Sequence, residues 1–473
     1  MNRYGIGQPV RRAEDQRFLT GRSRYVDDIE LPRMLHGAVV MSPHAHARIR
    51  GINIQQALES PGVELVLTGQ DAKADGLGGI PPLFMPEDMG GPKGYRTFRP
   101  LLEPAKVRHV GDRVAFVVAR TPEEARVAAE LVEVDYEPLP AAVSVEDAAR
   151  EGAPKVWDDN AAGNLAFPLM MGNKEATDAA FAKARHKVSV RLYNNRISAN
   201  AMEPRAAIGD FSNDSFTLHT SSQNPHGARS VLAGAVFKIP ETRLRVISPD
   251  VGGGFGMKGD TYPEDGLVLW ASRKLGRPVK WVATRTESLL GDNHGRDQLI
   301  TAEMALDENG KILAVRAQAL HAVGAYVTNA GVVPVLCSLR NIPNVYVVPA
   351  MLVASKATFT HTTPLGPYRG AGRPEASYVI ERLMDEAARK LDLDPVELRR
   401  RNFIPPSAMP YNTTAGWTVG AAAGWTYDSG EFARLTDRCL ELSDWDGYTQ
   451  RKQQTEARGR MRGRALIYYL EDS

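Results

Sequence analysis

Apolar and polar residues alternate in several short stretches of the chain, which is the pattern of half-buried β-strands. Turn-forming residues bound most of these stretches. The predicted strands cover residues 35–40, 64–67, 114–119, 132–136, 215–220 and 244–247. Two further stretches, 300–306 and 312–320, flank Asn309-Gly310, so they are predicted to form a β-hairpin.

Apolar residues three and four apart, the spacing of a buried helix face, occur between the strands. Residues 125–131 follow a capped start at Thr121, and residues 263–275 begin with a proline and stop at Gly276. Helices are also predicted over 227–237 and 375–391, and another begins at Asp394. Because strands and helices alternate, the pattern predicts a mixed α/β fold.

Composition divides the chain of 473 residues into four predicted parts. Residues 1–20 are polar and rich in arginine, which predicts an arm that lies on another surface. Residues 21–145 carry the first group of strands and helices and predict a compact α/β domain. Residues 146–165 mix Pro, Gly, Ala, Asp and Asn, as linkers do, and residues 166–473 form the second predicted domain.

Charge and cysteine content exclude several classes of protein. Lys and Arg number 58 against 56 Asp and Glu, a formal net charge of +2, so we expect no nucleic acid partner. Cys337 and Cys439 are too few for a disulfide framework or for an iron–sulfur cluster. The sequence shows no signal-peptide pattern and no run of about 18 apolar residues, so we expect a cytoplasmic protein without a membrane span.

A glycine-rich loop at residues 252–256 is the first candidate for chemistry. The hexapeptide GFGMKG, residues 254–259, matches the G-x-G-x-x-G pattern of dinucleotide-binding loops, and a predicted strand precedes it. In such loops the third glycine opens the helix that faces the pyrophosphate, whereas here Pro263 sets a later helix start. A NAD-dependent dehydrogenase is therefore the lesser alternative. The loop's amides are free to meet another polar ligand, or the loop is a tight turn without a ligand.

Two more stretches change this interpretation. Ser221-Ser222-Gln223-Asn224-Pro225 follows a predicted strand, and Pro367-Tyr368-Arg369-Gly370-Ala371-Gly372-Arg373-Pro374-Glu375 precedes the long predicted helix. With the glycine loop, they resemble the large molybdopterin-binding subunits of the xanthine dehydrogenase, aldehyde oxidase and carbon monoxide dehydrogenase family. Residues 18–29 and 42–49 resemble that family's a/b hammerhead domain. The resemblance implies an α/β (α+β) chain with a hammerhead domain over 21–145 and the first half of a molybdopterin-binding domain over 166–473.

The resemblance implies oxidative hydroxylation of an aldehyde or an N-heterocycle with an oxygen atom that comes from water. Family members hold molybdenum through the dithiolene of a pterin, expected here in the cytosine dinucleotide form, so no side chain of this protein is expected to ligate the metal. Two electrons then pass to iron–sulfur clusters and FAD. We expect these on an iron–sulfur subunit and an FAD subunit, since the chain has only two cysteines and no convincing flavin motif.

The family motifs assign roles to six residues. Gln223 and Arg369 are the expected catalytic residues: Gln223 donates to a molybdenum oxo group, and Arg369 stabilises negative charge that develops on the substrate. The same two residues are expected to contact the cofactor, together with Gly254, Phe255, Gly256 and Gly370.

Departures from the family motifs restrict the substrate. Copper-dependent carbon monoxide oxidisers carry a cysteine where this chain has Gly370. Purine hydroxylases carry a glutamate and a phenylalanine where it has Gly259 and Ala371. Carbon monoxide and purines are therefore disfavoured as substrates.

Two residue pairs with chemical potential are expected to be structural. His44 and His46 lie two apart but lack a third ligand for a metal. Trp417 and Trp425 are expected to pack in the fold rather than to enclose a substrate.

The family's catalytic glutamate lies in a second half of the subunit, which would follow Ser473. Residues 465–470 resemble the first strand of that half. Three explanations stay open: a truncated reading frame, a split subunit completed by another chain, or a cofactor-free remnant with an interaction role. We expect the chain alone to lack hydroxylase activity and to expose apolar surface where the second half would lie.

Overall fold

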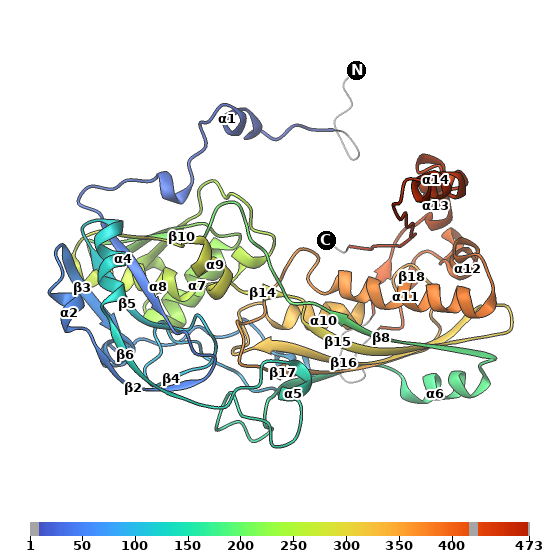
Figure 1. The fold of residues 1–473 in the computed structure, drawn as a ribbon, viewed down its shortest axis with the longest axis horizontal. Coiled ribbons are helices and arrows are strands. Elements are labelled where there is room, and N and C mark those ends of the chain that lie inside the picture. Colours follow the sequence, from blue (N-terminus) through green and yellow to red (C-terminus); the bar gives the residue numbers. More distant parts are fainter. Residues whose placement is uncertain (1–8, 416–423, 472–473) are drawn as a thin grey trace.

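The computed structural model describes residues 9–415 and 424–471 and consists of two lobes (Figure 1). Each lobe is built on one large β-sheet. Helix α1 (Asp15–Leu19), in the predicted N-terminal arm, is attached to the first lobe by the ion pair between Arg17 and Asp250. Trp417 lies outside the described residues.

The first lobe contains a seven-stranded sheet in the order β12-β11-β10-β13-β1-β5-β3. β1 pairs with β13 in parallel, as β11 does with β12, and the other neighbours are antiparallel. The strands are β1 (Leu35–Met41), β3 (Val63–Thr68), β5 (Arg113–Ala119), β10 (Ala206–Ser212), β11 (Ser215–Thr220), β12 (Leu244–Ile247) and β13 (Val279–Val282). Phe116, Trp270 and Trp281 belong to one core cluster, so the two predicted domains share a sheet and a core.

A three-stranded sheet and six helices complete the first lobe (Figure 1). The sheet runs in the order β4 (Lys106–Val107), β2 (Ala47–Asn53), β6 (Glu133–Pro138). The helices are α2 (Gln55–Leu58), α3 (Gly69–Ala74), α4 (Pro122–Glu130), α7 (Pro225–Ser230), α8 (Pro263–Leu275) and α9 (Arg285–Gly291). Thr121 caps α4 as predicted, because its side chain accepts from the Glu124 N–H. The predicted helix over 227–237 consists of α7 and a π-helical segment, Val231–Phe237.

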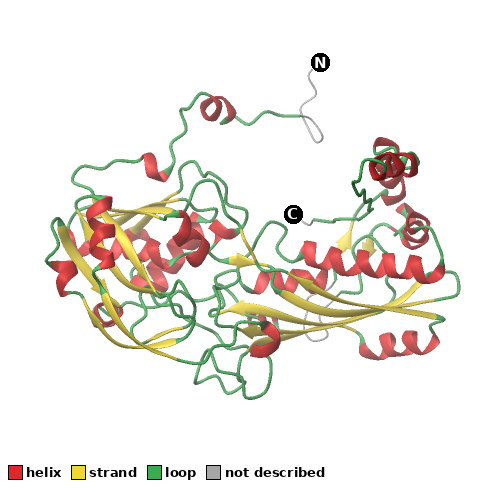
Figure 2. Ribbon diagram, in the orientation of Figure 1, coloured by secondary structure: helices red, strands yellow, loops and turns green. Residues whose placement is uncertain are grey.

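The second lobe is a five-stranded sheet with helices on both faces (Figure 2). Its order is β7 (Leu165–Gly172), β17 (Met351–Phe359), β16 (Ile312–Gly324), β15 (Gln298–Leu306), β8 (His186–Asn194). Helices α10 (Val332–Arg340) and α11 (Arg373–Leu391) cover one face, and α5 (Val145–Ala148) and α6 (Lys174–Lys183) lie on the other. β15 and β16 form the predicted antiparallel hairpin, with Gly310 at φ +78° in its turn.

Shorter elements join the lobes and form the C-terminal part of the described chain. The remaining strands are β9 (Ile197–Ser198), β14 (His294–Gly295), β18 (Tyr411–Asn412) and β19 (Thr426–Tyr427). The remaining α-helices are α12 (Pro395–Asn402), α13 (Phe432–Leu442) and α14 (Tyr448–Glu456), and 3₁₀ turns cover Val26–Asp28, Pro86–Met89, Glu241–Arg243, Met257–Gly259 and Pro406–Ala408. The predicted mixed α/β class is confirmed, and the strands and helices predicted from periodicity are present, with ends that shift by a few residues. The strand predicted at residues 465–470 is the exception: a strand needs a neighbour to pair with, and none of the described strands pairs with this segment.

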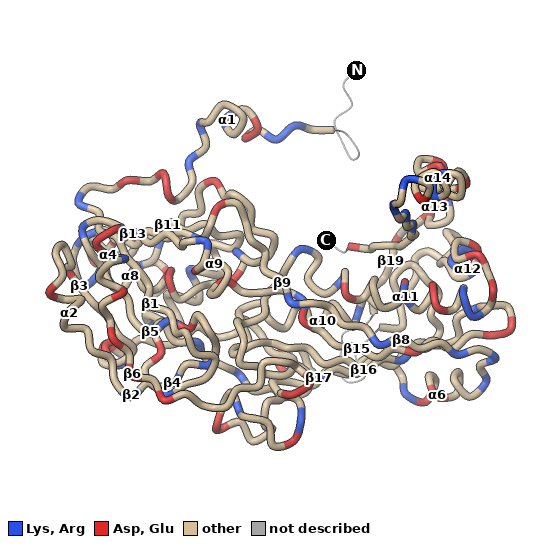
Figure 3. The backbone as a smooth tube through the Cα atoms, viewed as in Figure 1, with Lys and Arg blue, Asp and Glu red and all other residues tan. Residues whose placement is uncertain are grey.

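Basic and acidic residues are interspersed over both lobes, with neither sign confined to one of them (Figure 3). Across the described ranges, no helix combines the length and the apolar character that a membrane crossing requires.

His321 makes the fold sensitive to acid. It is buried between the sheet and α10, with Nδ1 2.8 Å from Ser355 Oγ and Nε2 2.8 Å from Ser338 Oγ. Ser338 donates its own proton to the Val335 carbonyl, so it accepts from His321 Nε2–H, and Ser355 donates to Nδ1 of a neutral ring. Burial lowers the pKa of His321 to about 3.

We predict that His321→Gln flattens the pH dependence of stability between pH 6 and pH 4. In this range the unfolded chain binds a proton at His321 that the folded chain excludes, so the wild type loses stability as the pH falls, by about 1.4 kcal/mol per pH unit from this residue. Urea unfolding at a series of pH values measures the slope. The exposed His226→Gln is the control, and an unchanged slope in the His321 variant would contradict the assignment.

Candidate active site

Three loops predicted to carry chemistry meet between the two lobes. The first follows β11 and carries Gln223, the second is the glycine loop between β12 and α8, and the third joins β17 to α11 and carries Arg369. Gly256 N–H donates to Gln223 Oε1 at 2.9 Å, and Arg369 N–H donates to the Phe255 carbonyl at 2.8 Å. The fold therefore brings the predicted site residues into one cluster.

The Gln223 carboxamide has a defined orientation. Because a backbone N–H can only donate, its bond from Gly256 identifies the carboxamide oxygen as the atom that faces the glycine loop. Gln223 N–H also donates to the Lys258 carbonyl at 2.9 Å, which fixes the backbone. The carboxamide N–H₂ makes no hydrogen bond within the described ranges and lies on an exposed side chain, so it is available to an acceptor outside the chain.

The glycine loop is shaped by close contacts that only glycine permits. A Cβ on Gly254 would lie 2.4 Å from Gln223 Oε1, and a Cβ on Gly256 would lie 2.8 Å from the Pro367 carbonyl oxygen. Gly256 also has φ +92° and Phe255 has φ +53°, so both residues have a positive φ, which most residues avoid. The Phe255 side chain is 42% exposed.

A buried ion pair supports the glycine loop from behind. Glu203 Oε2 accepts from Gly252 N–H at 2.7 Å and from Lys258 Nζ at 2.8 Å. Lys258 is buried, and burial lowers its pKa while Glu203 acts in the opposite direction. This pair could not be predicted, because nothing in the local sequence pattern around either residue places the two together.

The Arg369 loop presents its arginine outward. The Arg369 side chain is exposed, and its guanidinium makes no ion pair with any residue that the structure describes. Gly370 has φ +87°, and a Cβ there would lie 2.5 Å from Tyr469 Oη. The carbonyl of Arg369 accepts from Arg296 Nη2 at 2.8 Å, a contact that sequence reasoning also missed.

A network of buried charges underlies the site. Glu264, in the first turn of α8, accepts from Arg113 Nε at 2.8 Å and from Arg205 Nη1 at 3.0 Å. Arg205 also pairs with Asp292 and stacks on Tyr262, 3.7 Å from its ring centre. Burial by itself would raise the pKa of Glu264, but the two guanidinium groups outweigh it and hold the pKa well below its usual range.

The start of α8 does not suit a dinucleotide phosphate. The helix begins at Pro263, and its N-terminus is occupied by the buried carboxylates of Glu264 and Asp265. Asp265 accepts from Tyr262 N–H at 3.1 Å and from Thr220 Oγ1 at 2.8 Å. A phosphate would meet like charge there, which weakens the NAD alternative.

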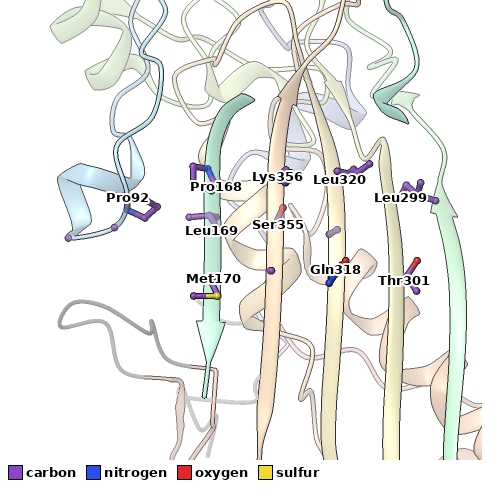
Figure 4. A pocket seen from close by; sticks show the side chains of 14 residues that line it. Pro92, Pro168, Leu169, Met170, Leu299, Thr301, Gln318, Leu320, Ser355 and Lys356 are labelled. Atoms are coloured by element: carbon purple, nitrogen blue, oxygen red, sulfur yellow. The ribbon is translucent and has the colours of Figure 1, made fainter. Parts of the chain in front are cut away.

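A cavity of about 860 Å³ lies elsewhere, on the face of the five-stranded sheet that carries α5 and α6 (Figure 4). Its lining is mainly apolar and includes Pro168, Leu299 and Leu320, with Lys356 as the one charged residue. None of the predicted site residues lines this cavity, so the cavity and the predicted active site lie in different places.

The residues expected to be structural lie in packed environments. His44 contacts the Tyr136 ring edge at a centroid distance of 4.9 Å, and His46 packs on His361 at 4.1 Å. Arg340 stacks on Trp425, 3.7 Å from its ring centre. Among the described residues, no three His, Cys, Asp or Glu side chains are grouped so that they could hold a metal ion.

Comparison with known proteins identifies the family. Residues 158–403 match the molybdopterin cofactor-binding domain, and residues 20–140 match the aldehyde oxidase and xanthine dehydrogenase a/b hammerhead domain. The chain belongs to the family of large molybdopterin-binding subunits of xanthine dehydrogenase, aldehyde oxidase and carbon monoxide dehydrogenase, as its motifs predicted.

Individual relatives show how much of such a subunit the chain spans. It is 32% identical over 470 residues to subunit gamma of the 6-hydroxypseudooxynicotine dehydrogenase complex of Paenarthrobacter nicotinovorans, covering 98% of this chain and 57% of the relative. The crystal structure of quinoline 2-oxidoreductase from Pseudomonas putida superposes with a TM-score of 0.87 at 36% identity, covering 95% of this chain and 56% of that one. The chain thus spans a little over half the length of these relatives.

One relative is shorter, and the match covers most of both proteins. The large molybdopterin subunit of nicotinate dehydrogenase from Eubacterium barkeri is 28% identical over 398 residues, which cover 84% of this chain and 89% of that protein.

Proposed function

We propose that this protein is one half of the molybdenum-binding part of a hydroxylase that acts on an N-heterocycle. The observation that carries the proposal is a pair of donors that have no partner among the described residues. They are the Gln223 N–H₂, oriented by the Gly256 N–H, and the guanidinium of Arg369, whose backbone N–H donates to the Phe255 carbonyl of the same glycine loop. A donor that is oriented before the ligand arrives, as the Gln223 N–H₂ is, stabilises charge with little reorganisation.

The donor set fits a cofactor held by hydrogen bonds rather than by side-chain ligands. When bound, a molybdenum–pterin group, proposed in its cytosine dinucleotide form, supplies the two-electron oxidising centre. Gln223 N–H₂ would donate to an oxygen atom of that group, and the close approach of Gly254 to the Gln223 carboxamide holds that carboxamide in place. Arg369 would lie beside the substrate and stabilise its developing negative charge, with Gly370 next to it.

The substrate class is narrowed by relatives and by residues. The names of the two relatives above refer to 6-hydroxypseudooxynicotine and to quinoline, which favours an N-heterocycle over an aldehyde. Gly370 leaves no thiolate for copper, and Gly259 and Ala371 lack the contacts expected for a purine. The overall reaction replaces a carbon–hydrogen bond with a carbon–hydroxyl bond whose oxygen comes from water, and it releases two electrons and two protons. The electrons would pass to iron–sulfur and FAD subunits in the cytoplasm.

We further propose that a second half, in the same polypeptide or in another chain, supplies the catalytic glutamate and the rest of the pterin site. Large apolar side chains are exposed around the cluster: Met202 is 90% exposed and Ile467 57%, and Phe255 and Tyr469 are 42% exposed each. The shorter nicotinate dehydrogenase subunit supports a form in which the half is a separate chain.

The test is turnover by the completed enzyme in ¹⁸O-labelled water. The chain is co-expressed with its second half and with iron–sulfur and FAD subunits, and is then offered quinoline, benzaldehyde, xanthine and carbon monoxide. We expect ¹⁸O in hydroxylated quinoline and much slower reaction of the other three. Exclusive turnover of benzaldehyde would contradict the choice of substrate class, and no turnover despite bound molybdenum would contradict the proposed function.

A further inference from the structure

We propose that Arg296 is a positioning residue for Arg369, with Glu375 as its anchor. The inference rests on the proposed function, because it assumes that Arg369 acts on the substrate. It assigns a role to a residue that lies far from the family motifs in the sequence, in the turn between β14 and β15.

The Arg296 guanidinium joins Tyr368 and Arg369 to the first turn of α11. Nη2 donates to the Arg369 carbonyl at 2.8 Å, and Nη1 donates to Glu375 Oε2 at 2.8 Å and to the Tyr368 carbonyl at 3.4 Å. The same group stacks on the Tyr368 ring, 5.2 Å from its centre. The planar fork of an arginine can hold two carbonyls and a carboxylate at once, which a lysine cannot do.

Arg296 itself sits on a rigid backbone. Arg296 and Asp297 have φ values of +67° and +60°, a conformation that ordinary residues adopt only when the surroundings hold it. Arg196 provides that hold, because its Nε donates to Asp297 Oδ2 at 2.7 Å and its Nη1 to the Thr363 carbonyl at 2.6 Å. The side chains are also largely buried: Arg296 is 13% exposed and Glu375 3%.

The neighbouring glycine ties this backbone to the Arg369 loop. A Cβ on Gly295 would lie 2.5 Å from Tyr368 Cβ, so the loop packs directly on the backbone of β14. His294 N–H donates to the Pro364 carbonyl at 3.0 Å, and Gly366 N–H donates to the His294 carbonyl at 2.9 Å. The segment 294–297 therefore forms a fixed support along the residues that lead to Arg369.

The Arg369 loop needs such a support because its own sequence gives it little rigidity. Gly370 and Gly372 follow with φ values of +87° and +95°, and the Arg369 side chain has no partner in the described part of the chain. Two bonds hold the Arg369 backbone: its N–H to Phe255, and its carbonyl to Arg296. Without Arg296 the residue is held on one side only, and misplacement by about 1 Å is enough to lower a rate about 100-fold.

The first test uses the Arg369–Gly370 bond as a trypsin site in the full chain. Arg296→Met and Arg296→Lys are compared with wild type, and Arg316→Met, which removes another arginine–glutamate pair, is the control. Mass spectrometry follows the peptide that ends at Arg369. We expect both Arg296 variants to be cleaved there about 10-fold faster or more, as loosening of a held segment predicts, with the control unchanged.

Arg296→Lys decides between positioning and simple stability. Lysine keeps the charge beside Glu375 but cannot bridge both carbonyls, so the variant should melt near the wild-type temperature and still be cleaved faster. In the completed enzyme we expect kcat to fall about 10- to 100-fold with a smaller change in KM. Wild-type cleavage and wild-type kcat in Arg296→Lys would overturn the inference. If the wild-type enzyme shows no turnover, the proposed function fails, and the trypsin result still tests the support.

Discussion

Replacement of Arg369 by methionine should lower kcat of the completed enzyme by about 100- to 1000-fold, the usual loss when one preorganised donor to developing charge is removed. The chain should remain folded, because the side chain is exposed and makes no ion pair with a described residue. The backbone bonds of Arg369 to Phe255 and Arg296 do not depend on its side chain, so the loop keeps its place.

Steady-state kinetics with the N-heterocycle measure the effect. Arg389→Met, at the exposed end of α11, is the matched control and should retain wild-type kcat. Arg369→Lys keeps the charge without the planar fork of the guanidinium, and we expect its kcat to lie between those of Arg369→Met and the Arg389→Met control. Unchanged kcat in Arg369→Met would show that this arginine does not act on the substrate.

The second large effect concerns stability. Glu264→Gln should lower the free energy of unfolding by about 3–5 kcal/mol, because it leaves two buried guanidinium groups without their shared carboxylate. Glu264 has no exposed surface, and Arg113 and Arg205 reach it from β5 and from the residue before β10. The network also connects the hammerhead domain, which contains Arg113, to the molybdopterin-binding domain, which contains Arg205 and Glu264.

Urea unfolding at neutral pH measures this loss. Glu303→Gln removes the carboxylate of its ion pair with Arg316, whose side chains are 35% and 40% exposed, and it should cost less than about 1 kcal/mol. Equal losses in the two variants would mean that the buried network adds nothing beyond a surface pair.

The sequence predicted the local structure well and the long-range pairing poorly. The strands at 215–220 and 244–247 and the helix from Pro263 follow from apolar periodicity and from proline and glycine signals. That β1 pairs in parallel with β13, across more than two hundred residues, cannot be read from any local pattern. The composition of residues 146–165 predicts a linker between two domains, yet strands from both predicted domains, such as β1 and β13, form one seven-stranded sheet.

In the site, too, the residues in local motifs could be predicted and their long-range partners could not. Gln223, the glycine loop and Arg369 were found because each lies in a recognisable motif, and the fold places them together. Lys258 with Glu203, and Arg296 with Glu375, support those motifs from behind. Each of these pairs joins residues that lie far apart in the sequence, so their roles become visible only once the loops are placed in space.

The molybdenum and pterin content of the purified protein tests the central claim most directly. The 473-residue chain is isolated alone and also together with its second half, and both samples are analysed for metal and for pterin. The account predicts stoichiometric molybdenum–pterin only when the second half is present, with no hydroxylase activity in the chain alone. Stoichiometric cofactor and turnover in the isolated chain would contradict it, as would a complete pair of halves that binds no molybdenum.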